Sequence, residues 1–196
     1  MERVSKRGRP GHSREHVIEV AVTEFNNRGY EATSMSSLAS LLRVSKSALY
    51  HHVSSKEEIL EEAVQSALLK LEAAVAAAFT QTLDGGDRLK LLIRGLVDAV
   101  CDSPDNARLA FDMRGNTEME RDLILRRAGI EEALQIAVEE AVEAKALRSC
   151  AEPRVVTSLV WGMIASASEL PRKNGEVSPA RLADVITELL LKNMGE

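Results

Sequence analysis

The sequence predicts an all-α fold, and three observations support this. Aromatic residues make up only 3% of the chain, Leu, Ala and Glu dominate it, and β-branched residues do not alternate with polar ones. Such alternation is typical of half-buried strands, whereas apolar residues here recur at helical spacing. We expect an N-terminal three-helix head that contains a helix-turn-helix, followed by a C-terminal helical bundle.

The first two helices are predicted over about 13–28 and 34–42. Ser13 is a good N-cap for the first helix, acidic residues follow near its positive end, and Gly29 stops it. The apolar residues of each helix recur on one side, so each helix should bury a single stripe.

The third helix is capped by Ser45 and reaches only residue 51 or 52. Helices this short are only marginally stable in water, because the few hydrogen bonds that they form barely offset the free-energy cost of helix nucleation. Two such short helices in succession therefore indicate that one of them is presented at the surface for a function. The fourth helix begins at Ser54 or Ser55, where Ser-x-x-Glu forms a capping box, and continues to about Phe79.

Five more helices follow from turn and cap residues, and three of them begin with Pro, whose missing N–H costs nothing there. They are predicted over about 87–101, 104–114, 118–147, 153–170 and 179–194.

Charge is divided unevenly along the chain. Through Leu60 there are nine Lys and Arg against seven Asp and Glu, with all four His; the remainder has sixteen against twenty-three, and the total is −5. The first third thus suits a phosphate backbone better than the acidic remainder does. Residues 1–12 form a basic flexible arm that could follow the minor groove or nearby phosphates, with a solubilising tail as the alternative.

Several function classes find no support in the residues. No apolar run follows the basic N-terminus or is long enough to span a bilayer, so we expect a cytoplasmic protein without a membrane partner. No enzyme, metal or cofactor is expected, because no His occurs beyond His52 and neither Gly-x-Gly-x-x-Gly nor Cys-x-x-Cys is present. His12 and His16 have no further ligand pattern. Cys101 and Cys150 are interpreted as inert thiols, with redox sensing as the alternative. A helical carrier or adaptor that binds no DNA stays open.

Residues 33–58 have the pattern of a helix-turn-helix. A reading helix enters the major groove with small or polar side chains on its first turn and longer donors one turn on. Helix starts also attract phosphates through free N–H groups. Each residue alone has an ordinary alternative as a cap, a core residue or a solvated side chain. The predicted DNA-contacting residues are Thr33, Ser34, Ser45, Lys46, Ser47, Tyr50, His51, His52 and Lys56, with Lys6, Arg7 and Arg9 of the arm.

Four separated blocks in this region resemble the DNA-binding head of the TetR family of bacterial transcriptional regulators. They are Gly29-Tyr30-Glu31-Ala32-Thr33-Ser34-Met35, Leu38-Ala39, Val44-Ser45-Lys46-Ser47-Ala48-Leu49-Tyr50-His51-His52 and Ser55-Lys56-Glu57-Glu58. The resemblance covers roughly residues 13–60. It implies a homodimer that binds a palindromic operator, represses transcription and is released by a small-molecule effector. It also implies a DNA-binding domain over 13–58 and a ligand-binding and dimerisation domain over 59–196.

Three positions depart from the family pattern. Arg43 stands in the turn where Gly is usual, Ser47 replaces a frequent Gly and Val53 replaces a frequent Phe. The site of Arg43 often needs a left-handed backbone, which costs a bulky residue on the order of 1 kcal/mol.

The C-terminal part resembles the family less, so its sites come from residue type and spacing. A pocket for a small apolar or amphipathic effector is predicted from aromatic and flexible side chains, each of which could instead be plain core: Phe111, Met113, Met119, Leu123, Trp161 and Met163. The segment 159–164 with Pro171-Arg172 and residues 182–184 is faintly similar to family members that respond to acyl-CoA thioesters. Dimerisation is predicted from wide apolar stripes on the last two helices: Leu159, Met163, Leu182, Ile186, Leu189 and Leu190.

Overall fold

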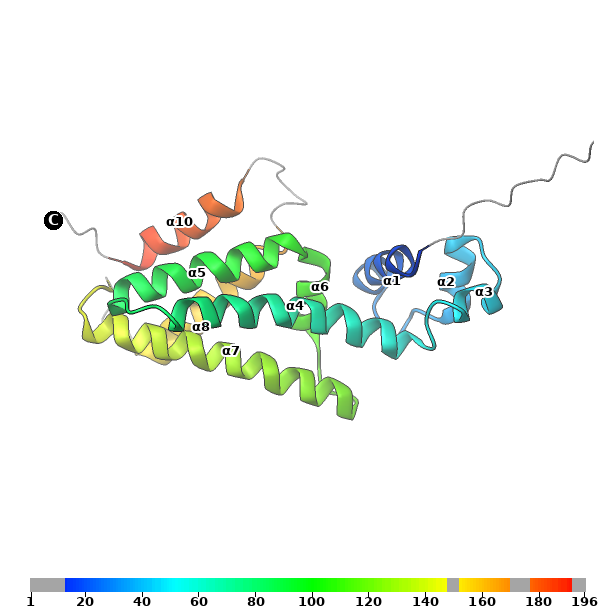
Figure 1. Cartoon of the computed structure of the whole chain (residues 1–196), viewed down its shortest axis with the longest axis horizontal. Coiled ribbons are helices and arrows are strands. Elements are labelled where there is room, and N and C mark those ends of the chain that lie inside the picture. The colour runs from blue at the N-terminus through cyan, green and yellow to red at the C-terminus, as the bar shows by residue number, and fades with distance from the viewer. Residues whose placement is uncertain (1–12, 148–151, 170–176, 192–196) are drawn as a thin grey trace, which may run out of the picture. The chain divides into compact units, whose positions relative to one another are not determined.

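The computed structural model describes residues 13–147, 152–169 and 177–191. These parts of the chain contain nine α-helices and no strand, apart from an isolated antiparallel bridge between Leu147 and Leu191 (Figure 1). The predicted all-α fold is confirmed. None of the helices within these ranges is both long and apolar enough to cross a membrane.

The chain divides after Leu60 into two compact units, which we call the head (residues 13–60 of the described chain) and the body (from residue 61 onward). The head contains α1 (Arg14–Arg28), α2 (Met35–Leu42) and α3 (Lys46–Tyr50). Helix α4 (Lys56–Phe79) belongs to both units, since its first residues lie in the head and the rest lie in the body.

The head contains a small apolar core, and its three helices begin with side-chain caps. The Ser13, Ser34 and Ser45 side chains accept hydrogen bonds from backbone N–H groups three residues further on, as predicted for N-caps. Helix α2 packs against both α1 and α3. The buried apolar residues of the head are Val17, Ala21, Val22, Phe25, Leu38, Ala39, Leu42, Leu49, Val53, Ile59 and Leu60.

Helix α5 (Gly85–Asp102) lies at the centre of the body and packs against α6 (Pro104–Asp112), α7 (Glu118–Glu143), α8 (Pro153–Ser166) and α10 (Pro179–Leu190) (Figure 1). The start of α5 lies close to α7: a Cβ atom added to Gly85 would lie 2.3 Å from the Glu140 carbonyl oxygen. Gly at this position therefore permits the close approach of two helices.

Three helices of the body end about four residues earlier than the sequence pattern predicts. Helix α7 stops at Glu143 rather than near residue 147, because Lys145 takes a left-handed backbone with φ of 57°. Helix α8 stops at Ser166 rather than at residue 170, and α10 at Leu190 rather than near residue 194. Apolar residues continue at helical spacing past these three ends, so the sequence pattern predicted the helix ends too far along the chain. Helix α5 instead begins earlier than predicted, because the Asp84 side chain caps it.

Candidate nucleic-acid interface

Helix α3 turns a polar side outward and holds on to the head with one buried residue. Ser45, Lys46 and Ser47 are exposed at its start, and Tyr50 is 51% exposed one turn on. Leu49, in contrast, is fully buried. The helix has only five residues, so this anchor and the neighbouring helices must hold it in place.

Three of the other side chains predicted to line this surface are also accessible. His51 is exposed and His52 is half-buried. Ser34 is exposed at the start of α2, where it forms a reciprocal capping pair with Ser37. The hydroxyl oxygens of Ser34 and Ser45 accept N–H groups of their own helices at 3.1 Å, so capping accounts for part of their bonding capacity.

The turn between α2 and α3 has the backbone expected of it. Arg43 has φ of 57° and ψ of 41°, in the left-handed region, and its N–H donates to the Ser40 carbonyl at 3.1 Å. The predicted strain at this non-glycine residue is therefore present. Of the other two unusual positions, Ser47 is exposed and Val53 belongs to the core.

Thr33 faces inward rather than toward solvent. It is only 3% exposed, and its hydroxyl donates to the Gly29 carbonyl at 2.9 Å. This bond closes the turn between α1 and α2. In the free head the hydroxyl is therefore withdrawn from any phosphate.

Lys56 is also directed into the head. Its ammonium group donates to the Tyr30 carbonyl at 3.1 Å and lies 4.1 Å from the centroid of the Tyr30 ring. It is also 3.7 Å from a carboxylate oxygen of Glu31, and the side chain is 20% exposed. These contacts join the start of α4 to the turn after α1, a role that the sequence pattern does not reveal.

Arg14 is a residue of this region that the sequence pattern did not single out. Its Nε donates to the His52 carbonyl at 3.1 Å, and its Nη2 donates to Glu58 at 2.8 Å. The other oxygen of Glu58 accepts the Ser54 N–H at 2.6 Å. The Ser54 N–H and the Arg14 guanidinium hold the pKa of Glu58 below its usual value. The Ser-x-x-Glu pattern at Ser55 and Glu58 was the available signal. The Ser55 hydroxyl accepts the Glu58 N–H at 3.1 Å as that pattern predicts, but the Glu58 carboxylate binds Ser54 and Arg14, and the pattern does not identify Arg14 as a partner.

The arm with Lys6, Arg7 and Arg9 lies outside the described residues. Its sequence nevertheless matters, because residues 13–60 contain five Lys and Arg against six Asp and Glu. The positive balance through Leu60 thus comes from the first twelve residues.

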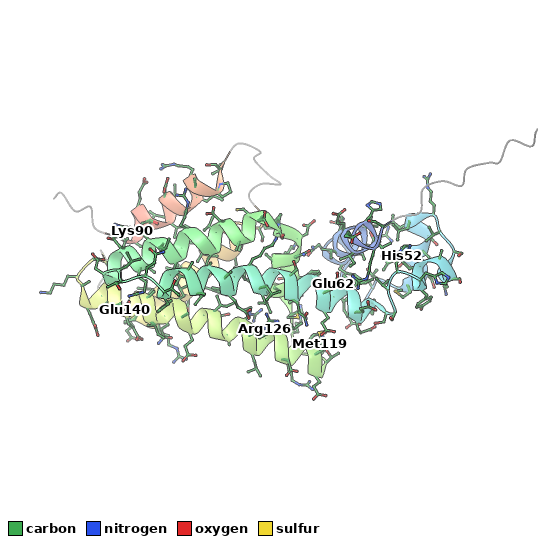
Figure 2. The ribbon with its side chains drawn as sticks, in the orientation of Figure 1. His52, Glu62, Lys90, Met119, Arg126 and Glu140 are labelled. Carbon is green, nitrogen blue, oxygen red and sulfur yellow. The ribbon has the colours of Figure 1, made fainter. Side chains whose placement is uncertain are left out.

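Two of the predicted effector residues are in contact with each other. Phe111 of α6 and Trp161 of α8 meet edge to face, with ring centroids 5.5 Å apart. Leu123 is buried at 3% exposure. Met163 is two residues beyond Trp161 and therefore lies about 160° around α8 from it. Met113 and Met119 are half-buried, and Figure 2 shows Met119 at the first turn of α7, far along that helix from Glu140.

The predicted dimerisation residues differ in their exposure to solvent. Leu159 is 62% exposed and Leu189 is 64% exposed, whereas Ile186 is 6% exposed and packs within the subunit. Met163, Leu182 and Leu190 are half-buried. Val155, which the sequence pattern did not single out, is 49% exposed one turn before Leu159 on α8.

No group of side chains suited to a metal ion occurs among the residues that the structure describes. Burial raises the pKa of the Cys101 thiol, and Asp98 adds to this, so the reactive thiolate is disfavoured. Cys150, His12 and Pro171-Arg172 lie outside the described ranges.

Two family models match the chain. The model described as bacterial regulatory proteins, tetR family, matches residues 17–63. The model described as a tetracyclin repressor-like C-terminal domain matches residues 82–194.

Curated relatives match over shorter stretches. The HTH-type transcriptional activator FasR of Mycolicibacterium smegmatis is 32% identical over 104 residues, which are 53% of this chain and 48% of FasR. The biofilm operon icaADBC HTH-type negative transcriptional regulator IcaR of Staphylococcus aureus is 33% identical over 52 residues, which are 26% of this chain and 28% of IcaR. The chain thus spans about half or less of the length of these relatives.

Solved structures match almost the whole chain. A member of the TetR transcriptional regulator family from Streptomyces coelicolor A3 is 29% identical, with a TM-score of 0.81 over 100% of this chain and 96% of that one. AibR, solved in complex with isovaleryl coenzyme A and operator DNA, is 23% identical, with a TM-score of 0.73 over 91% of this chain and 97% of that one. AibR thus has the same fold.

Proposed function

The chain belongs to the TetR family of bacterial transcriptional regulators, and we propose that it is a homodimeric repressor that releases a palindromic operator when a small effector binds. The observation that carries this proposal is the outward polar side of α3, which stands over the buried Leu49. A helix presented in this way can enter the major groove without losing its place in the head.

In the proposed complex, α3 reads base edges and the helix starts contact phosphates. Ser45, Lys46 and Ser47 reach the groove from the first turn, while Tyr50 and His51 reach it one turn on, with His52 beside them. The N-terminal end of α2 at Ser34 supplies a phosphate contact. We leave Thr33 out of this interface because its hydroxyl already donates to a backbone carbonyl within the head. Lys56 can reach a phosphate only with the ammonium donors that the Tyr30 carbonyl leaves available.

Replacing Tyr50 by Ala tests this interface. About half of this side chain is exposed, so its truncation removes little packing and leaves the fold intact. Affinity for a duplex selected from a random library should fall by roughly ten- to a hundredfold, the range expected when one base or phosphate interaction is removed. Leu125→Ala, which truncates a residue of α7 with 70% exposure, should leave the affinity unchanged. Wild-type protein that selects no duplex would favour the alternative of a carrier or adaptor.

We propose that the basic arm adds phosphate contacts, since residues 13–60 have no excess of positive charge. Deletion of residues 1–9 should then lower the slope of log affinity against log salt by about 0.9 for each phosphate that the arm neutralises. An unchanged slope would mean that the arm is a solubilising tail.

The dimer is proposed to form through the outer sides of α8 and α10. Leu159 and Leu189 leave large apolar surfaces in solvent on these helices, and a helix pair from each subunit could cover them in a four-helix interface. Leu159→Glu should therefore yield a monomer in sedimentation. Leu125→Glu is the matched control, because it places the same charge at a similarly exposed site on α7. A dimer that survives Leu159→Glu would exclude this surface.

We propose an apolar or amphipathic effector that binds near Phe111 and Trp161, and an acyl-CoA thioester is the first compound to test. This choice is supported by the edge-to-face pair and by the structural neighbour AibR, which was solved with isovaleryl coenzyme A. Trp161 is the single Trp of the chain, so its fluorescence reports directly on this place. Isovaleryl coenzyme A should change the fluorescence saturably, and coenzyme A alone or isovalerate alone should not. Phe111→Ala should weaken the response.

Release is proposed to occur by a population shift between two separations of the reading helices. In the operator-bound dimer these helices lie about one turn of DNA, roughly 34 Å, or a multiple of it apart. An effector shifts this population only as far as it prefers the second state, however tightly it binds. A repressor acts by occluding its site. The two curated relatives differ in this respect, because FasR is named as an activator and IcaR as a negative regulator. Transcription from a promoter that overlaps the selected site should therefore fall when protein is added and recover with effector; a rise would identify an activator.

A further inference from the structure

We propose that Arg14 and Glu58 are positioning residues for DNA recognition, which hold the segment that joins the reading helix to α4. This inference rests on the proposed DNA-binding function. Neither side chain needs to touch DNA to play this part. Each acts through the backbone of residues 52–54, immediately after the exposed side chains of α3.

The two side chains hold two peptide groups on either side of Val53. Arg14 donates from Nε to the His52 carbonyl at 3.1 Å, and Glu58 accepts the Ser54 N–H at 2.6 Å. They are joined to each other by a 2.8 Å contact from Nη2 to the carboxylate. One guanidinium and one carboxylate therefore restrain the backbone before and after Val53, and Val53 itself is buried at 2% exposure. We call this arrangement the Arg14–Glu58 clamp.

The clamp joins segments that are far apart in the sequence. Arg14 is the first residue of α1, while Glu58 lies in the first turn of α4, 44 residues later. The first turn of α4 is also held from the other side, since Lys56 donates to the Tyr30 carbonyl beyond the end of α1. The first residue of α1 and the turn that follows its last residue thus both contact the start of α4. A rotation of this turn should carry the reading helix with it rather than bend the joining segment.

The clamp suits a positioning role better than a purely stabilising one. The Arg14 and Glu58 side chains are 40% and 35% exposed, and ion pairs this accessible contribute little to folding. Their bonds to backbone groups are nevertheless charge-assisted and directional, and the guanidinium fork fixes two acceptors at once. Lys at position 14 would keep the charge but lose this fork. The clamp should therefore affect where α3 lies more than whether the head folds.

The test uses the full-length protein and the duplex that wild-type protein selects from a random library. Arg14→Lys and Glu58→Gln should each weaken binding by about tenfold, which is the scale of one charge-assisted hydrogen bond. The slope of log affinity against log salt should stay unchanged, because the number of neutralised phosphates stays the same. Arg28→Lys is the matched control: Arg28 is also on α1 and pairs with Glu24, and within the described ranges it bonds no loop backbone. Its affinity should equal that of the wild type.

A measurement on the free protein separates positioning from folding. Amide exchange at residues 53–55 should rise in Arg14→Lys and Glu58→Gln, while exchange in the core of α1 and the thermal midpoint stay close to the wild-type values. The double variant Arg14→Glu with Glu58→Arg restores an ion pair but not the donor to His52. Its affinity should remain low.

Four results would overturn the inference. They are unchanged affinity in Arg14→Lys and Glu58→Gln, full recovery in the exchanged pair, a loss of affinity that parallels a loss of thermal stability, and, in the charge-removing variant Arg14→Gln, a salt slope lower by about 0.9, which would signal a direct phosphate contact. Failure of the proposed function is distinct, because in that case wild-type protein itself would select no duplex.

Discussion

The side chains that cap single helices in the head and the side chains that join different helices in the body span different sequence distances. In the head, Ser13, Ser34 and Ser45 cap helices through N–H groups only three residues away. In the body, Arg126 of α7 makes a two-bond contact with Glu72 of α4 at 2.8 Å, and Arg88 of α5 reaches Glu140 of α7 at 2.6 Å. Figure 2 marks Arg126 and Glu140 well apart along α7. Local contacts can be inferred from a sequence window, whereas contacts between residues more than 50 positions apart cannot.

This difference also concerns the end of α4. Arg88 donates to the carbonyls of Ala78, Gln81 and Leu83 after and within the last turn of that helix, and it lies 5.1 Å from the Phe79 ring. One side chain thus satisfies a carbonyl group of the last helical turn and two carbonyl groups of the segment that follows it. The body fastens α4 by arginines from other helices, while the head fastens its start by the Arg14–Glu58 clamp and Lys56.

The largest expected effect comes from the anchor of the reading helix. Leu49→Ala removes a fully buried side chain and should cost about 2–5 kcal/mol, because a five-residue helix has little else to hold it. Hydrogen exchange should show α3 and α2 opening while the body stays protected. Leu41→Ala on α2 is the control, since Leu41 is 52% exposed and its truncation should change stability little. Equal losses in both variants would contradict the assignment of Leu49 as anchor.

The next effect concerns the close approach of α5 and α7 in the body. Gly85→Ala would place Cβ 2.3 Å from the Glu140 carbonyl oxygen, so a helix must shift, at a cost of about 1–3 kcal/mol. Thermal unfolding monitored by Trp161 fluorescence measures this loss. Gly129→Ala on α7 meets no atom within 4 Å and should instead stabilise the helix by about 0.5–1 kcal/mol. Equal changes in the two variants would mean that α5 and α7 are not this close.

Acid should weaken the head through its helix starts. The carboxyl groups of Glu15, Glu57 and Glu58 have a lowered pKa, chiefly because backbone N–H groups favour their ionised forms. A lowered pKa in the folded state contributes stability that is present above the unfolded value of about 4.5 and is lost as the pH falls through the folded value. Exchange protection of α1 and of the first turn of α4 should therefore be constant from pH 7 to about pH 5 and decline below about pH 4.5. Glu58→Gln should reduce this dependence; an unaltered profile would contradict the contribution of that carboxylate.

The smallest expected effect comes from two left-handed residues, one in each unit. Arg43 in the head and Lys145 in the body both have φ of 57°. Replacement of either by Gly should relieve backbone strain and raise the free energy of unfolding by up to about 1 kcal/mol in chemical denaturation, partly offset by the entropy of Gly. Lys90→Gly, in the interior of α5, is the control and should cost about 1 kcal/mol. A loss at Arg43 similar to that at Lys90 would show that its side chain stabilises the turn.

Much of the head could be predicted from the sequence, and the reasons are visible in particular residues. The caps at Ser13, Ser34 and Ser45 were expected and are confirmed, as is the left-handed backbone at Arg43. Each depends on the residue itself and on neighbours within one turn. Thr33 followed the same pattern, yet its hydroxyl bonds to Gly29 inside the turn. Residue type alone does not reveal whether a hydroxyl at a helix start faces solvent.

The body was less predictable because its patterns are ambiguous in space. The apolar stripe of α7 continues past Glu143, but a left-handed residue ends the helix there. Ile186 and Leu189 belong to one apolar pattern on α10, and the first is buried within the subunit while the second is in solvent. Which side of a wide stripe faces the subunit's own core depends on helices that are distant in the sequence. Phe111 and Trp161 meet for the same reason, although 50 residues separate them.

The sequence by itself determined that this chain is helical, where most of its helices begin, and that α3 presents a polar side, because capping and helical periodicity involve residues three or four positions apart. The tertiary structure alone decided the partners of Arg14, Lys56 and Glu58. These charged side chains are long enough to reach several backbone groups. Which groups they bond depends on the folded arrangement of α1, α3 and α4, which no local pattern records.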